Sequence, residues 1–198
     1  MSRELLFGIA GAVLVLITLI IAVKAIFDGK FKPHRITYGI FFLINIVVLT
    51  NQIINEGGHS VYFIAVGFFG ISLIFGLSFK YGMGGSSVLD RVALISALSL
   101  GIYWIATQDS IFSTVIAIVI DLIALIPTIY KAYRHPDTEI YLNWMISGVG
   151  AFLGVFAIED PEWVLFAFPI YIFFGNFFVV LSKYLGHQKL RRNLTSTS

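Results

Sequence analysis

The sequence predicts an all-α membrane protein with seven transmembrane helices, and long apolar runs are the first observation behind that prediction. Hydrophobic residues make up 58% of the 198 residues and charged residues only 12%, whereas an ordinary soluble domain carries about 25% charged residues. A helix needs roughly 20 apolar residues to cross a hydrocarbon layer, and seven runs of about that length leave no room for a separate soluble domain. The runs are Leu5–Val23, Ile36–Ile54, Val61–Phe79, Val88–Thr107, Ile111–Tyr130, Ile140–Ile158 and Trp163–Ser182.

Basic residues are the second observation, because they fall almost entirely on one side of these runs. When the gaps between runs are assigned alternately to the two sides of a membrane, twelve of the thirteen Lys and Arg residues share one side, and only Arg3 lies on the other. Short loops that carry Lys and Arg stay in the cytoplasm, so we expect the N-terminus outside and the C-terminus inside. The twelve are Lys24, Lys30, Lys32, Arg35, Lys80, Arg91, Lys131, Arg134, Lys183, Lys189, Arg191 and Arg192.

An internal repeat is the third observation, and it predicts how the seven helices are grouped. If the second half of the chain is slid back until Phe173 lies on Phe69, Ile140 falls on Ile36. The pattern gives two three-helix repeats joined by one linker helix, a 3+1+3 order, and the linker makes the two repeats parallel. Parallel repeats recur in transporters, where the substrate site lies near the midplane at the repeat interface. We expect a first repeat at 1–82, a linker helix at 83–109, a second repeat at 110–186 and a cytoplasmic tail at 187–198.

The end of the fifth run and the following loop carry a short motif, residues 127–139. It has a proline with a polar neighbour, a basic residue four positions on, a second basic residue, and Thr138-Glu139 before the next run. This motif resembles the signature of the PQ-loop and SWEET-like transporter superfamily, whose 3+1+3 order and outside N-terminus agree with what the charges predict. Thr128 replaces the usual glutamine, and Ile20-Ile21 stand where the first repeat would carry Pro-Gln. The helix plan of nicotinamide riboside transporters is also compatible.

Two prolines inside the runs are candidate hinges. A proline within a helix removes one backbone hydrogen bond and clashes with the preceding turn, and in a membrane the freed carbonyl must find another partner. We predict that Pro127 lets the fifth helix bend during alternating access, and that Pro169 in the seventh run is its partner kink. A static kink is the alternative for Pro127.

Asp121 is the candidate for the central functional residue, because it lies in the middle of the fifth run. A charged carboxylate at the bilayer centre costs about 2.5–3.5 kcal/mol on insertion scales unless it faces a cavity or is neutral. No Lys or Arg lies at the same depth to pair with it. We predict that Asp121 contacts substrate or carries protons; a neutral carboxyl bonded to a neighbouring helix is the alternative.

Four further polar residues within the runs are candidates for a substrate site. Asn176 in the seventh run and Ser72, its repeat mate in the third, match places where polar side chains face each other across the pocket of SWEET-like carriers. Asn45 lies near the middle of the second run, and Ser147 lies where the sixth helix would face substrate. An amide both donates and accepts hydrogen bonds, which suits a hydroxyl-rich or zwitterionic solute. Helix-to-helix hydrogen bonding is the alternative role for such residues.

The sequence excludes several classes of function. The chain has no cysteine, and its four histidines have no metal-ligand spacing, so we expect no metal site and no cofactor. Basic residues spread over separate headgroup-level segments contact anionic lipid and exclude a nucleic-acid partner. No catalytic motif is present, so we expect no enzyme activity.

The leading functional prediction is a transporter for a small polar solute such as a sugar, an amino acid or a vitamin. It would be a passive facilitator or a proton-coupled carrier, working by alternating access in the plasma (inner) membrane of a prokaryote. The alternative is a seven-helix receptor or sensor of the same architecture. Whether identical chains assemble into a homo-oligomer is left open.

Overall fold

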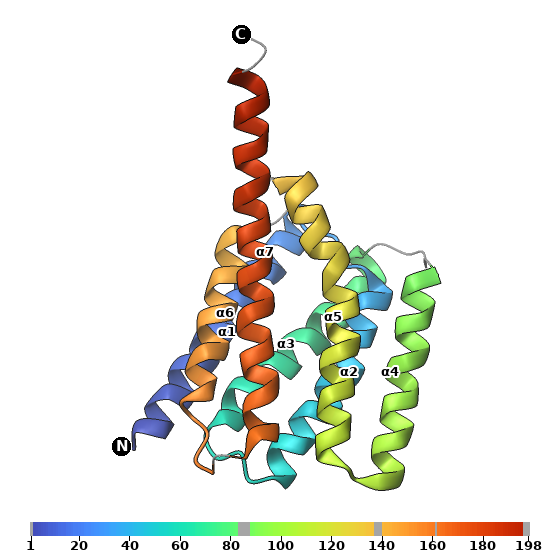
Figure 1. Cartoon of the computed structure of the whole chain (residues 1–198), viewed down its shortest axis with the longest axis vertical. Coiled ribbons are helices and arrows are strands. Elements are labelled where there is room, and N and C mark those ends of the chain that lie inside the picture. Colours follow the sequence, from blue (N-terminus) through green and yellow to red (C-terminus); the bar gives the residue numbers. More distant parts are fainter. Residues whose placement is uncertain (1, 83–87, 137–139, 161, 196–198) are drawn as a thin grey trace.

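In a computed structural model, the chain forms a bundle of helices whose two termini lie at opposite ends (Figure 1). The structure describes residues 2–82, 88–136, 140–160 and 162–195. We name the end where the first helix begins the amino end, and the opposite end the carboxyl end. The helices are α1 (Arg3–Phe27), α2 (Arg35–Ile54), α3 (Ser60–Tyr81), α4 (Val88–Thr107), α5 (Ser110–Arg134), α6 (Tyr141–Val155) and α7 (Trp163–Thr195).

Every predicted run corresponds to one of these helices, and the local start signals explain several boundaries. Ser2 precedes α1, and its hydroxyl oxygen accepts a hydrogen bond from the Leu5 amide at 3.1 Å. Asp109 precedes α5, and its carboxylate accepts one from the Phe112 amide at 2.9 Å. Each contact satisfies an amide that has no partner inside the helix. The prediction of an all-helical fold is thus confirmed for the described residues.

Helix α6 is shorter than its predicted run. It has 15 residues and ends at Val155, whereas the apolar run continues to Ile158. The amides of Phe156 and Ala157 bond to the carbonyls of Leu153 and Gly154, so the chain tightens into a narrower turn before the polar residues that follow. At 1.5 Å per residue, α6 is about 22 Å long.

Helix α7 is longer than its predicted run and projects beyond the other helices at the carboxyl end (Figure 1). It continues to Thr195, past Ser182 and into the segment expected to be a separate tail. Leucine, glutamine, lysine and arginine in this extension favour a helix, and Arg192 in the last turn suits the helix dipole. Gly186 lets the extension lie close to α5, since an added Cβ would meet the backbone of Tyr133.

Within the part of the chain that the structure describes, five helices are long and apolar enough to cross a membrane: α1, α2, α3, α5 and α7. Helix α6 and the Leu94–Thr107 stretch of α4 are apolar but shorter. Large apolar side chains also cover the outside of the bundle; Ile102 is 70% exposed and Phe69 is 66% exposed. An exposed apolar surface of this kind matches lipid rather than water.

Six of the helices pack in a ring, in the order α1, α3, α2, α5, α7, α6, and α6 closes the ring on α1. Helix α4 packs against α2 and α5 from outside (Figure 1). Glycines permit close contacts of α6 with its neighbours: an added Cβ on Gly150 of α6 would meet the Gly11 carbonyl of α1 at 3.2 Å, and one on Gly154 would meet the Phe63 ring at 3.0 Å. These two α6 glycines therefore serve helix packing.

Candidate functional site

A cavity of about 170 Å³ lies within the ring, and all six ring helices contribute to its wall. Its polar lining consists of Asn45 from α2, Asp121 from α5, Ser147 from α6, and Asn176 and Tyr171 from α7. Four of the five predicted substrate-binding residues are therefore brought together, although they are far apart in the sequence. Their role in binding stays a prediction.

Asp121 is 7% exposed, and its closest polar partner is Tyr171. The Tyr171 hydroxyl donates a hydrogen bond to Asp121 Oδ2 at 2.6 Å, joining α5 to α7. Tyr171 does not stand out in the sequence, because a tyrosine in an apolar run is also typical of the interfacial aromatic belt. The sequence signal that could have identified Tyr171 is its position two residues after Pro169, at about the same depth in the bundle as the Asp121 carboxyl group.

The two cavity asparagines are anchored in the same way. Asn45 Nδ2 donates to the Phe41 carbonyl at 2.9 Å, and Asn176 Nδ2 donates to the Ile172 carbonyl at 2.7 Å. Each acceptor is the carbonyl four residues earlier on the same helix, so neither amide bonds a neighbouring helix among the described residues. The side-chain oxygen of each asparagine is therefore left for the cavity.

Ser72 behaves differently from its repeat mate Asn176. The Ser72 hydroxyl donates to the Phe68 carbonyl at 2.7 Å, and Ser72 is not among the residues that line the cavity. The repeat places it at the matching position on α3, but its short side chain bonds to its own helix, as serines in helices often do.

A larger cavity of about 490 Å³, which we call the vestibule, extends from the central cavity to the carboxyl end. The two cavities share lining residues, among them Phe41, Trp144, Ser147 and Asn176. The basic residues Lys30, Lys32 and His34 line the vestibule where the α1–α2 connection meets solvent. The polar cavity is therefore connected to the carboxyl end.

The amino end is closed by a buried contact between α2, α3 and α7. Gln52 is 2% exposed; its Nε2 donates to the Leu165 carbonyl at 3.0 Å, and its Oε1 accepts from the Ser60 hydroxyl at 2.7 Å. Pro169 lies inside α7 and has no amide hydrogen, so it cannot bond to the carbonyl of Leu165 four residues earlier. Gln52 thus satisfies the carbonyl that Pro169 leaves free.

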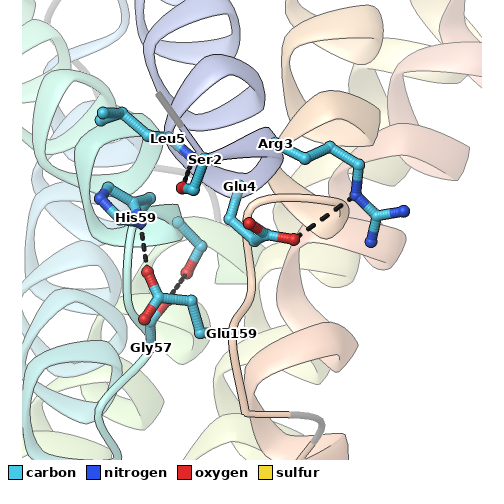
Figure 2. A network of polar contacts seen from close by, with 8 residues as sticks. Ser2, Arg3, Glu4, Leu5, Gly57, His59 and Glu159 are labelled. Atoms are coloured by element: carbon cyan, nitrogen blue, oxygen red, sulfur yellow. Dashed lines mark hydrogen bonds and ion pairs between the residues drawn. The ribbon is translucent and has the colours of Figure 1, made fainter.

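Loops strengthen this closure at the surface of the amino end. Figure 2 shows the His59 ring of the α2–α3 turn paired with the Glu159 carboxylate of the α6–α7 loop. Gly58 has a φ of +57°, and a Cβ there would meet the Glu159 side chain at 2.7 Å, so this close approach requires glycine. The two turns therefore lie directly against each other.

A second buried cluster joins α2 to α4 and α5 near the same end. Asn51 Nδ2 donates to Ser113 Oγ at 3.0 Å and to Thr114 Oγ1 at 3.2 Å, while Asn51 Oδ1 accepts from Trp104 Nε1 at 2.7 Å. This hydrogen bond gives Trp104 a place in helix packing.

Pro127, the other predicted hinge, lies within α5 between Asp121 and the carboxyl end. Its side chain lies outside the described part of the structure, as do residues 137–139 of the motif. Because proline has no amide hydrogen, the Ile123 carbonyl lacks its helical partner. Ile123 lines the vestibule, so the interruption in α5 lies beside the open side of the cavity.

Comparison of the chain with models of protein families, with curated proteins and with solved structures gave no match. Within the described residues, no group of three His, Cys, Asp or Glu side chains could hold a metal ion. The candidate site is therefore defined by its own geometry: a polar cavity inside an apolar bundle, connected to one end and closed at the other.

Proposed function

We propose that this chain is an integral membrane carrier that moves a small polar solute by alternating access, passively or with protons. The observation that carries the proposal is the central cavity, whose wall comes from all six ring helices and whose polar lining comes from α2, α5, α6 and α7. This cavity shares lining residues with the vestibule. A carrier needs a site near the midplane that is reached from one side at a time. A closed amino end and a vestibule at the carboxyl end fit one state of such a cycle.

The packing order supports the proposed 3+1+3 arrangement of parallel repeats. If α1, α2 and α3 are exchanged with α5, α6 and α7, the ring order α1, α3, α2, α5, α7, α6 is unchanged. This is the property expected of two repeats related by a two-fold axis along the bundle, with α4 as the linker. The same order supports the resemblance to PQ-loop and SWEET-like transporters, and the vestibule position of Thr128, in the proline motif, agrees with it.

The proposed orientation places the carboxyl end in the cytoplasm, and for a prokaryotic inner membrane this is the side of the positive charges. Lys24, Lys80 and Arg134 lie in the last turns of α1, α3 and α5, and Arg35 begins α2. Gly57 is a poor site for a reporter cysteine, because an added Cβ would meet the Gln52 side chain. The exposed residues Asp160 and Lys189 are better.

We expect Asp160→Cys to react with an impermeant thiol reagent added to intact cells, and Lys189→Cys to react only after the membrane is permeabilised. The natural chain has no cysteine, so each variant reports one site. Reaction of Lys189→Cys in intact cells would reverse the proposed orientation.

The experiment that tests the carrier proposal is uptake by proteoliposomes that contain the purified chain. A panel of labelled sugars, amino acids and vitamins is offered with and without an imposed pH gradient, and empty liposomes provide the baseline. Saturable uptake supports a carrier, and dependence on the gradient supports proton coupling. Saturable binding without flux for every bound solute would instead favour the receptor alternative.

A further inference from the structure

The central cavity offers negative charge and hydrogen-bond acceptors, and from this we propose that it binds its solute through an ammonium group. The inference rests on the proposed function, since it names the chemistry of the solute that the carrier would take. Asp121 is the one charged side chain among the described residues that line the central cavity. Tyr171 engages its Oδ2, which leaves Oδ1 as an acceptor.

The two asparagines add acceptors beside this carboxyl group. Asn45 and Asn176 each use one N–H on a carbonyl of their own helix. The Oδ1 atom and one N–H of each amide remain. An ammonium group carries several donors and no acceptor, so it can satisfy the Asp121 and amide oxygens together. A carboxylate solute would instead meet Asp121 as a like charge.

The walls of the cavity favour a cation for a second, independent reason. Aromatic faces attract cations through their ring quadrupole, and the attraction is strongest where water is excluded. The aromatic residues of the lining come from four different helices, so rings surround the polar groups on several sides. They are Phe41, Phe63, Trp144, Phe168 and Tyr171.

The position of the lysines is consistent with this selectivity. Lys30 and Lys32 line the vestibule but not the central cavity, and Lys30 pairs with Asp28 at 3.6 Å. Both lysines are exposed, so their field on an entering solute is screened by salt. Selection for an ammonium group therefore takes place at the depth of Asp121, where screening is weak.

The test compares three probes of equal length that differ at one end: 3-amino-1-propanol, 1,3-propanediol and 3-hydroxypropionate. Binding to the purified full-length chain in lipid nanodiscs is measured by titration calorimetry at neutral pH. We expect the amine to bind about tenfold more tightly than the diol, and the acid to bind least. Equal affinities, or a preference for the diol or the acid, would overturn the proposal even if every variant failed to fold.

Asp121→Asn keeps the shape of the side chain and removes its charge, so it is expected to abolish the preference for the amine over the diol. Glu162→Gln removes an exposed carboxylate at the amino end and is the matched control that keeps the preference. An unchanged preference in Asp121→Asn would also overturn the proposal.

Flux of the same probes into proteoliposomes separates this inference from the proposed function. Selective binding of the amine without any flux would support the ammonium site and refute the proposal that the chain is a carrier. Flux of the diol or the acid, with no preference for the amine, would support the carrier proposal and refute the ammonium site.

Discussion

Asn45 and Asn51 are buried asparagines on the same helix, less than two turns apart, yet they have different surroundings. Asn51 donates to two hydroxyl groups of α5 and accepts from the Trp104 indole of α4. Within the described residues, Asn45 bonds only to a carbonyl of α2, and it lines the central cavity. The difference separates a polar group that joins helices from one that is left for a ligand.

The same contrast holds between the two ends of the bundle. At the amino end, Gln52 and Asn51 use their side-chain groups on neighbouring helices, and the cavity is closed there. Toward the carboxyl end, polar side chains line a vestibule instead. A side-chain amide contributes more to helix packing when it bonds another helix than when it bonds its own. Substitutions at the amino end should therefore affect stability, and those in the cavity should affect transport.

The largest expected effect is at Asp121, which tests whether the cavity carries protons. Asp121→Asn should abolish accumulation driven by a pH gradient, because an amide can pass through the cycle but has no proton to release. Downhill exchange should persist at solute concentrations that saturate the variant. The measurement is uptake into proteoliposomes with and without the gradient, with Glu162→Gln as the control. Continued accumulation by the variant would place the proton site elsewhere.

The next prediction compares the two asparagines directly. Asn51→Leu should destabilise the fold by about 2–3 kcal/mol, because it leaves the Trp104 N–H without its acceptor and the two α5 hydroxyls without their donor. Asn45→Leu should cost less than about 1 kcal/mol, because the Asn45 amide joins no other helix among the described residues. Leucine has the same branched shape and the same number of side-chain non-hydrogen atoms as asparagine, so neither change opens a cavity. Equilibrium unfolding in detergent micelles gives both values.

Transport should show the opposite order for this pair. Asn45→Leu is expected to weaken solute binding, whereas Asn51→Leu protein that remains folded should bind normally. If Asn45→Leu destabilised the chain as much as Asn51→Leu, the distinction between helix-joining and cavity-facing asparagines would fail.

How far the sequence could predict this molecule depends on the range of the interaction involved. Helix positions follow from local apolar runs, so α4 lies where a run of spanning length is expected. Helix α7 extends past Ser182 because helix propensity does not stop where hydrophobicity does. Asp121 stood out because a carboxyl group is costly in a bilayer. Gln52 and Tyr171 did not, because their roles depend on partners more than a hundred and about fifty residues away.

A smaller effect is expected at Pro127, which distinguishes a hinge from a static kink. Pro127→Ala restores the amide that can bond the Ile123 carbonyl, and a continuous helix between Asp121 and the carboxyl end is stiffer. We expect transport to slow several-fold while solute binding and the unfolding midpoint stay near those of the natural chain. Ile126→Ala, at an exposed neighbouring position, is the control. Unchanged flux at matched protein levels would contradict the hinge and show that Pro127 produces only a static kink.

The smallest expected effect is the coupling between Gln52 and Pro169, and it tests the closure of the amino end most directly. In the natural chain the Leu165 carbonyl has no amide partner at position 169, and Gln52 supplies the hydrogen bond. Pro169→Ala provides that amide, so the carbonyl no longer depends on Gln52. Gln52→Ala should therefore be less destabilising in the Pro169→Ala background than alone, by about 1 kcal/mol.

A double-mutant cycle of unfolding free energies in detergent micelles measures this difference. The free-energy cost of losing the proline ring is the same with and without Gln52, and the cost of losing the Gln52–Ser60 bond is the same with and without Pro169. Both costs therefore cancel in the cycle. The remaining coupling energy reports the hydrogen bond to the Leu165 carbonyl. Ser60→Ala is the matched control: it removes the other partner of Gln52 and should be additive with Pro169→Ala. If Gln52→Ala were additive as well, the Gln52 contact would be independent of the proline, and Pro169 would have no part in closing the amino end.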